Sequence, residues 1–524
     1  MGAAIFNSWG HKRPVGATIS PPQSTCDPWA PPSCPPQDLQ ATPSCLPHRA
    51  WTPTTFHDLS PPRSPSSDAS DDQPQLASMT LDQSRPHNLS TASTTVKMNG
   101  HVTSCLLDSG STESFIHPDT TDNWRLSYVN KEFAVCTTYP DAVIVHKCID
   151  DAAIKMVAGF RQGGRFPVFS YYHKKTKMII MRSSQPLTGA NGKRCKEDEH
   201  FLAAVIQPDK KGYIIDTRSI QAAHQAKVKG GGFESKTNYH NWKRLHRPIA
   251  RGRVLQESLI KLVDACNDQS NSIDRWLSKL ETSKWLTHLK TVLTTACMAA
   301  QCVDREGASV LIHGSEGRDT TLQLTSLAQI ILDPDCRTIS GFQALIEREW
   351  LQAGHPFQLR CASSAYSHAK LKQEAPVFLI FLDCCWQMSC QFPCSFQFNE
   401  QFLITLFEHA YASCFGTFLC NNEKERFTLN VKEQTISIWA RMNSPSERKH
   451  YVNPLYERNN FTIWPSVAPQ SLQLWQGLFL RWIRTPEHQN EAWEQIKHIV
   501  ELGSRKANPS STELSVLKED YAAN

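Results

Sequence analysis

Length, composition and charge already exclude several classes of protein. The chain has 524 residues, with 55 lysines and arginines against 50 aspartates and glutamates, and a net charge of +5. It is long enough for two or three domains with a large core, and so mild a charge gives no reason to expect a nucleic-acid partner. The longest apolar run, Val377 to Leu382, is far shorter than the ~20 residues that cross a bilayer. We expect no transmembrane segment and, because the N-terminus lacks the apolar region of a signal peptide, a cytoplasmic protein.

The eighteen cysteines are scattered, mostly among apolar neighbours and without paired Cys-x-x-Cys spacing. Neither a zinc site nor a disulfide framework is indicated, and reduced thiols are the expected state in the cytosol. We therefore predict no metal and no cofactor.

The N-terminal segment differs in composition from the rest of the chain. Residues 1–93 contain 16 of the 32 prolines, with runs of Ser, Thr and Gln and little apolar periodicity. Such a segment cannot bury enough apolar surface to offset the entropy lost on ordering. We predict a disordered Pro/Ser-rich region over 1–93.

Residues 94–122 combine alternating apolar residues, an Asn99-Gly100 turn and a loop that begins at Asp108, a pattern that predicts a β-hairpin followed by a loop. This stretch resembles the first lobe of a retrotransposon aspartic protease, with Asp108 at the catalytic aspartate. Such enzymes need two aspartates that share a proton, and no second Asp-Ser/Thr-Gly motif follows. We interpret 94–122 as a truncated fragment with a vestigial aspartate, and an aspartic protease is the third and least favoured function.

Strand and helix patterns begin after this fragment. Two apolar runs, at Val168 and at Met178 to Ser183, flank a basic turn and predict paired strands, and Tyr213 to Asp216 predicts a buried strand. An amphipathic helix is predicted from apolar residues that recur at intervals of three and four. These residues are Trp285, Leu289, Val292, Leu293, Ala296 and Ala300.

The chain is organised around the stretch that starts at Ser309. Val310 to Ile312 predicts a short buried strand, and after two glycines and small polar residues a helical pattern begins, with Thr320 and Thr321 available as N-caps. A strand, a tight loop and a helix start place backbone N–H groups where an anion can bind. A phosphatase built on such a loop also needs a thiolate to attack phosphorus and an arginine to hold the phosphoryl oxygens.

This stretch resembles the signature loop of the myotubularin phosphoinositide phosphatases, which reads His-Cys-Ser-Asp-Gly-Trp-Asp-Arg-Thr. Aligned residue by residue, the cysteine falls on Gly314 and the arginine on Thr320, while Glu316 and Arg318 replace an aspartate and the tryptophan. The residues that match the family are His313, Ser315, Gly317, Asp319 and Thr321. The degenerate loop over 313–320 therefore predicts a pseudophosphatase with no catalytic residue.

Further blocks carry the same resemblance, among them Phe160 to Val168, Tyr213 to Arg218 and Phe415 to Asn422. The resemblance implies an α/β domain of the protein-tyrosine-phosphatase-like type over 123–500, with a mixed central sheet and helices on both faces. Residues 501–524 are expected to form a disordered tail. His355 and His409 invite a catalytic interpretation, but packed or surface histidines are commoner, and we assign them no role.

The resemblance also implies a function. Inactive members of this family bind and regulate active phosphoinositide 3-phosphatases, so we expect an adaptor that contacts such relatives and lies peripherally on endomembranes. The coiled coil expected to carry that contact is reduced to a fragment at Ile496, Ile499 and Val500, which predicts weakened association because the a/d seam provides most of the binding energy.

Two alternatives remain for the loop itself. One is a residual phosphoinositide phosphatase in which Glu316 and Asp319 act on water, although the transition state then lacks its main stabilising groups. The other is an anion-binding module that contacts phosphate or a phosphoinositide headgroup. Its candidate phosphate-binding residues are Ser315, Gly317, Arg318 and Thr320.

Overall fold

The computed structural model describes residues 94–98, 101–105, 123–268, 272–362 and 373–481, together with 494, 497 and 498. The Pro/Ser-rich region, the predicted vestigial aspartate Asp108, the coiled-coil fragment at Ile496, Ile499 and Val500, and the 501–524 tail lie outside the described residues. β1 (Thr94–Met98) pairs antiparallel with β2 (His101–Cys105), so the predicted hairpin is confirmed.

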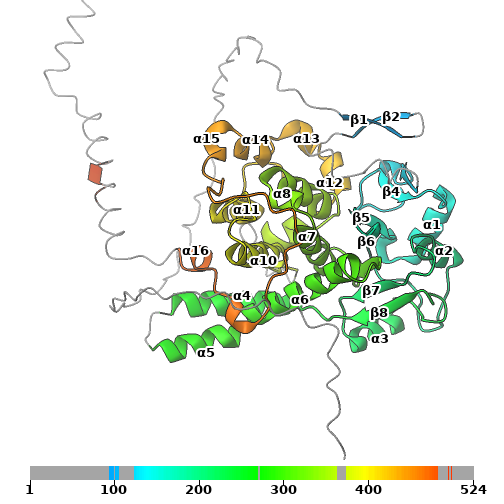
Figure 1. The fold of residues 1–524 in the computed structure, drawn as a ribbon, viewed down its shortest axis with the longest axis horizontal. Helices are drawn as coiled ribbons and strands as arrows, with labels where there is room; N and C mark the ends of the chain where they lie inside the picture. The colour runs from blue at the N-terminus through cyan, green and yellow to red at the C-terminus, as the bar shows by residue number, and fades with distance from the viewer. Residues whose placement is uncertain are drawn as a thin grey trace, which may run out of the picture. The chain divides into compact units, whose positions relative to one another are not determined.

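A five-stranded sheet forms the centre of the described domain (Figure 1). Its strands, in spatial order, are β5 (Val168–His173), β6 (Met178–Ser183), β9 (Val310–His313), β7 (Gly212–Asp216) and β8 (Trp242–His246). β5 and β6 are antiparallel, whereas β6, β9, β7 and β8 are mutually parallel. β9 is the central strand and is fully buried, as parallel strands usually are. The mixed, largely parallel sheet predicted from the sequence is confirmed.

One face of the sheet packs on the N-terminal part of the domain. Side chains on a strand alternate between the two faces, and Ile179, Met181 and Leu311 point into this layer. The layer's elements are β3 (Trp124–Ser127), β4 (Val143–His146), α1 (Asp151–Phe160) and α2 (Lys196–Ala204). Apolar residues of α1 and α2 complete this core.

The other face is covered by α6 (Trp285–Asp304) and α7 (Thr320–Leu332), which contact each other and the sheet. Every residue of α7 is buried, and the apolar stripe predicted for the helix that begins at Trp285 is buried too, so this helix is a core element. α10 (Val377–Gln391) packs against both helices. Helices on both faces of the sheet confirm the predicted fold class.

The remaining helices surround this framework (Figure 1). They are α3 (Ile220–Val228), α4 (Arg253–Asn267), α5 (Ile273–Ser283), α8 (Ile339–Ile346), α11 (Glu400–Tyr411), α12 (Glu423–Thr428), α13 (Val431–Gln434), α14 (Ile438–Met442), α15 (Pro445–Arg448) and α16 (Gln476–Phe479). A second core forms around Trp350, whose indole lies 4.9 Å, centroid to centroid, from the rings of both Phe378 and Phe381. Among the helices of the described residues, none combines the length and the apolar character that a bilayer crossing requires.

Candidate functional site

The loop between β9 and α7 begins at the carboxyl end of the central strand. The chain leaves the sheet at His313 and becomes helical at Thr320. Asp319 is the N-cap residue and its side chain makes no capping bond. The sequence offered Thr320 and Thr321 as N-caps. The helix starts directly after Asp319, so these two threonines are its first two residues.

Gly317 has the left-handed backbone conformation, with φ of +68°. A Cβ at this position would lie 2.3 Å from the carbonyl oxygen of Ser183. Only glycine avoids both the backbone strain and the contact. The loop is therefore pressed against the end of β6, and Arg165 donates from Nη2 to the Gly317 carbonyl at 2.7 Å.

Gly314 faces a pair of threonine hydroxyls. Oγ1 of Thr217 and Oγ1 of Thr320 are hydrogen-bonded at 2.9 Å. A Cβ on Gly314 would lie 2.7 Å from the Thr217 oxygen and 3.6 Å from the Thr320 oxygen. The space that a nucleophile's side chain at this position would need is therefore occupied by the hydroxyl pair.

His313 is fully buried and belongs to an ionic network beneath the loop. Its Nε2 lies 3.0 Å from Oε2 of Glu234, and Arg161 lies 2.7 Å from the other oxygen of that carboxylate. Arg161 also pairs with Asp198 at 2.6 Å. Burial alone would raise the pKa of Glu234, but His313 and Arg161 outweigh it and hold the pKa well below its usual value. His313 thus anchors the end of β9 to segments from the N-terminal half of the domain.

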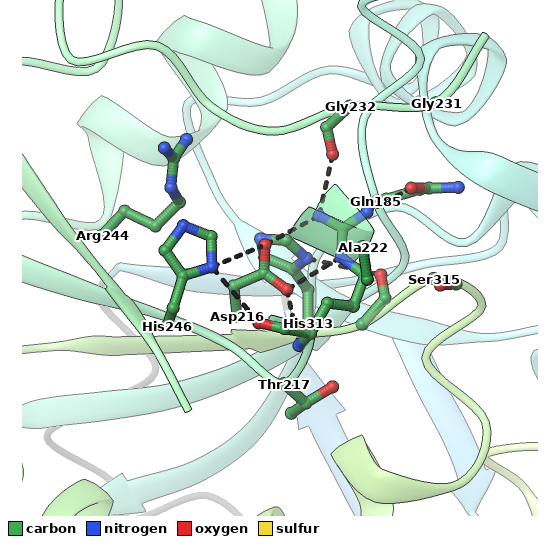
Figure 2. Close-up of polar contacts among 12 residues, drawn as sticks. Gln185, Asp216, Thr217, Ala222, Gly231, Gly232, Arg244, His246, His313 and Ser315 are labelled. Carbon is green, nitrogen blue, oxygen red and sulfur yellow. Dashed lines mark hydrogen bonds and ion pairs between the residues drawn. The ribbon is translucent and has the colours of Figure 1, made fainter. Parts of the chain in front are cut away.

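A second buried pair lies beside this network, at the end of β7 (Figure 2). Arg218 donates to Oδ2 of Asp216 at 2.7 Å and to the carbonyl of Gly232 at 2.9 Å. Nδ1 of His246 lies 3.8 Å from the same Asp216 oxygen. Burial alone would raise the pKa of Asp216, but His313 and Arg218 lower it by more. The net pKa lies below the usual value, so the carboxylate stays ionised. The guanidinium of Arg218 therefore binds Asp216 and the Gly232 carbonyl and does not face the outer side of the loop.

Arg318 does not reach the anion side of the loop. Its Nε donates to the carbonyl of Gly354 at 2.9 Å and its Nη2 to the carbonyl of Asn421 at 3.0 Å. Burial lowers the pKa of Arg318. The side chain that occupies the family's tryptophan position therefore joins the loop to two later segments of the chain.

Asp319 is held by an arginine and a histidine. Oδ2 accepts from Nη2 of Arg360 at 2.8 Å, and Oδ1 lies 3.2 Å from Nδ1 of His355. Burial alone would raise the pKa of Asp319, but the His355 and Arg360 contacts hold it well below its usual value. A carboxylate so paired is a poor proton donor, whereas Glu316 beside it is exposed to solvent.

Ser315 lies at the open side of the loop. Its hydroxyl accepts from Nη1 of Arg251 at 2.8 Å, and Arg251 itself is exposed. Thr321 is fully buried with its Oγ1 unpartnered among the described residues, 3.8 Å from the Cβ position of Gly314. A hydroxyl without a partner at a helix N-terminus is a feature that an anion would satisfy.

Of the four candidate phosphate-binding residues, Ser315 and Thr320 place hydroxyls at the loop. The carbonyl of Gly317 accepts from Arg165, and Arg318 points elsewhere. Sequence reasoning missed Arg251, which lies in a stretch rich in basic residues that could have drawn attention to it. His355 contacts Asp319, and Nδ1 of His409, on α11, lies 3.0 Å from Oγ of Ser413, which follows that helix. Within the described ranges, no cluster of three or more His, Cys, Asp or Glu side chains could hold a metal.

A central parallel strand that feeds a tight loop and a buried helix is an anion-binding arrangement, and a phosphatase-type α/β domain is built on such a unit. The sequence profile of the myotubularin-like phosphatase domain matches residues 90–427. The chain is 65% identical over 386 residues to myotubularin-related protein 9 from Homo sapiens, covering 74% of this chain and 70% of that protein. It is 62% identical over 403 residues to the Mus musculus protein of that name, covering 76% and 74%.

A more distant relative carries an enzyme's name. Phosphatidylinositol-3,5-bisphosphate 3-phosphatase MTMR2 from Mus musculus is 42% identical over 365 residues, covering 69% of this chain and 56% of that protein. The chain belongs to the myotubularin family, and the family predicted from the loop is confirmed.

Proposed function

We propose that the protein is a catalytically inactive myotubularin that acts as an adaptor for active phosphoinositide 3-phosphatases. The observation that carries the proposal is the hydroxyl pair of Thr217 and Thr320 over Gly314. Phosphoryl transfer through a covalent intermediate requires a nucleophile at that place, and a positioned cation to stabilise the transition state. Neither is supplied by Gly314 or Thr320.

A residual hydrolase that uses loop carboxylates is disfavoured on the same geometry. Asp319 is bound to His355 and Arg360 and stays ionised, so it has no proton to donate to a leaving group. Glu316 would bring negative charge towards a dianionic phosphate.

Phosphate release from vesicles that contain phosphatidylinositol 3-phosphate tests the inactivity. We expect no release above that of the same protein after denaturation. Turnover that persists through repeated purification and is lost in Glu316→Gln or Asp319→Asn would overturn the proposal.

The adaptor role is supported by the family membership together with the retained fold, since an intact phosphatase-like domain without its nucleophile can still present a surface to relatives. The expected partners are family members that remove the 3-phosphate from phosphoinositides, in the cytoplasm and at endomembranes. Co-precipitation of the full chain with such enzymes, and the rate of those enzymes with and without it, is the test. An unchanged rate and no recovery with any active relative would contradict the role.

A second candidate function is phosphate binding without turnover, and the unpartnered hydroxyl of Thr321 favours it. The N-terminal amides of α7 and the exposed guanidinium of Arg251 supply the other donors. Calorimetry with a soluble inositol phosphate measures it: Arg251→Ala is expected to weaken binding, whereas Arg253→Ala, at an exposed arginine that pairs with Glu257 on its own helix, serves as the matched control. Equal affinity in Arg251→Ala and the unmodified protein would exclude a role for that guanidinium.

A further inference from the structure

α5 is an amphipathic helix whose apolar side is left half open. Its apolar residues recur at intervals of three and four, which places them on one side of the helix. They are Ile273, Trp276, Leu277 and Leu280. Ile273 is 73% exposed and Leu277 49% exposed, and the other two are half-buried. All eleven residues of α5 are described, and Ser283 is the only one of them that is buried. Because a helix in a protein is stabilised mainly by the packing of its apolar face, α5 lacks part of its usual cover.

The chain leaves the domain beside the carboxyl end of α5. The ring of Phe479, on α16, lies 5.7 Å, centroid to centroid, from the ring of Trp285. Trp285 begins α6 and follows Ser283, the last residue of α5, by two positions. The continuous described stretch ends at Arg481, which donates to Glu408 at 2.7 Å. Figure 1 shows α5 next to α4 at the edge of the domain. Whatever follows Arg481 therefore starts close to the half-open helix.

The sequence that follows has a helical apolar pattern. In the C-terminal segment, residues 487–501, the large apolar residues recur at intervals of three and four. They are Trp493, Ile496, Ile499 and Val500. Glu494, Lys497 and His498 have helical backbone conformation, and Glu494 pairs with Lys497 at 2.7 Å. The C-terminal segment thus carries an apolar stripe of the kind that the open side of α5 would accept.

The connection is long enough for this segment to reach α5. Five residues, 482–486, join Arg481 to the C-terminal segment, and they span up to about 20 Å when extended. α5 has eleven residues and is therefore about 16 Å long. The segment can begin beside Ser283 and run back along α5 towards Ile273.

The charges of the two helices are of opposite sign. The C-terminal segment carries four glutamates and one lysine, whereas residues 273–284 carry three lysines and arginines and two acidic residues. An antiparallel arrangement brings Glu487 and Glu491 to the end of α5 where Lys284 is exposed. Charge complementarity therefore favours the same direction as the position of the chain's exit.

We propose that the C-terminal segment packs as a helix, antiparallel to α5 of the same chain, on the side formed by Ile273 and Leu277. A second copy of the chain is a poorer occupant, because one face of an eleven-residue helix is far smaller than the roughly 800 Å² that each partner buries in a stable interface. A tethered segment needs less area, since a short linker holds it at a millimolar effective concentration. The docking depends neither on what the loop between β9 and α7 binds nor on the adaptor role.

Hydrogen exchange of the full chain, followed by mass spectrometry, tests this proposal. Slow exchange is expected for amides of both α5 and the C-terminal segment. Ile496→Ser with Val500→Ser changes only the segment and is expected to speed the exchange of α5 amides by about tenfold or more, because the cover of α5 is lost. Ile273→Ser with Leu277→Ser is expected to speed the exchange of the C-terminal segment in return.

The matched control is Ile436→Ser with Leu455→Ser, which changes two exposed aliphatic residues in other parts of the domain. It is expected to leave the exchange of α5 as it is in the unmodified protein. Equal acceleration in the test and control variants would count against the proposal, because a general loss of stability would then explain both. Exchange of the C-terminal segment at the rate of an unstructured chain, or an α5 that does not respond to Ile496→Ser with Val500→Ser, would overturn it. Protection that disappears on dilution would mean that a second copy supplies the segment, and it would overturn the contact within one chain.

Discussion

Replacing Gly314 by cysteine should destabilise the domain without restoring chemistry. The new Cβ would lie 2.7 Å from Oγ1 of Thr217, and that hydroxyl is itself held by Thr320 at 2.9 Å. Overpacking of a buried site costs about 1–3 kcal/mol, and separating the two hydroxyls adds about 1 kcal/mol. We therefore expect Gly314→Cys to lower the free energy of unfolding by about 2–4 kcal/mol.

A double-mutant cycle identifies the cause. Thr217→Ala removes the oxygen that the cysteine meets, so the two changes together should cost less than the sum of the single changes, by at least ~1 kcal/mol. Denaturant unfolding of the four proteins measures this, and phosphate release should stay at background in all of them, because Thr320 cannot hold the phosphoryl oxygens. Additive effects, or full stability in Gly314→Cys alone, would refute the idea that the hydroxyl pair fills the pocket.

Three further predictions concern other residues, Asp383, Arg360 and Gly317. Burial raises the pKa of Asp383 to about 7, so this carboxyl should lower stability as the pH rises from about 4 to about 7, by up to ~4 kcal/mol. Asp383→Asn should flatten that pH profile in denaturant titrations, and a steeper profile would contradict it. Arg360→Ala leaves Asp319 with one partner and should lower the free energy of unfolding by about 1–3 kcal/mol. Because the pKa of Asp319 is lowered in the folded protein, this loss should vanish in acid. A loss that does not depend on pH would count against the pairing. Gly317→Ala should lower the thermal midpoint through left-handed strain and contact with Ser183, and an unchanged midpoint would show that the loop can move aside.

The strand–loop–helix unit was predictable because its signals are local. Val310 to Ile312 is a β-branched apolar run, and α7 shows helical spacing from its start, so periodicity alone identified both. Arg318, by contrast, was among the candidate phosphate-binding residues that the sequence suggested. The structure gives this residue two backbone partners elsewhere.

What could not be predicted depends on contacts between distant segments. Thr217 and Thr320 are 103 residues apart, and nothing in either local pattern indicates that their hydroxyls meet. Arg251 reaches Ser315 from a segment 64 residues away. The predicted cap position was wrong: the sequence offered Thr320 and Thr321, whereas Asp319 is the N-cap, although aspartate is at least as favourable as threonine at that position. The side chain of Asp319 makes no capping bond and pairs instead with His355 and Arg360.

Arg318 bears on how natural variants of this protein should be interpreted. Its guanidinium joins the loop to Gly354 and Asn421, which follow it by 36 and 103 residues. Whatever the loop binds, this side chain ties distant segments of one fold together. A variant that loses it would leave two partly buried carbonyls without this donor, and a loss of a few kcal/mol lowers the steady-state amount of a protein in the cell. A harmful substitution at this motif would then act through protein abundance, and immunoblotting would detect it where an activity assay would not.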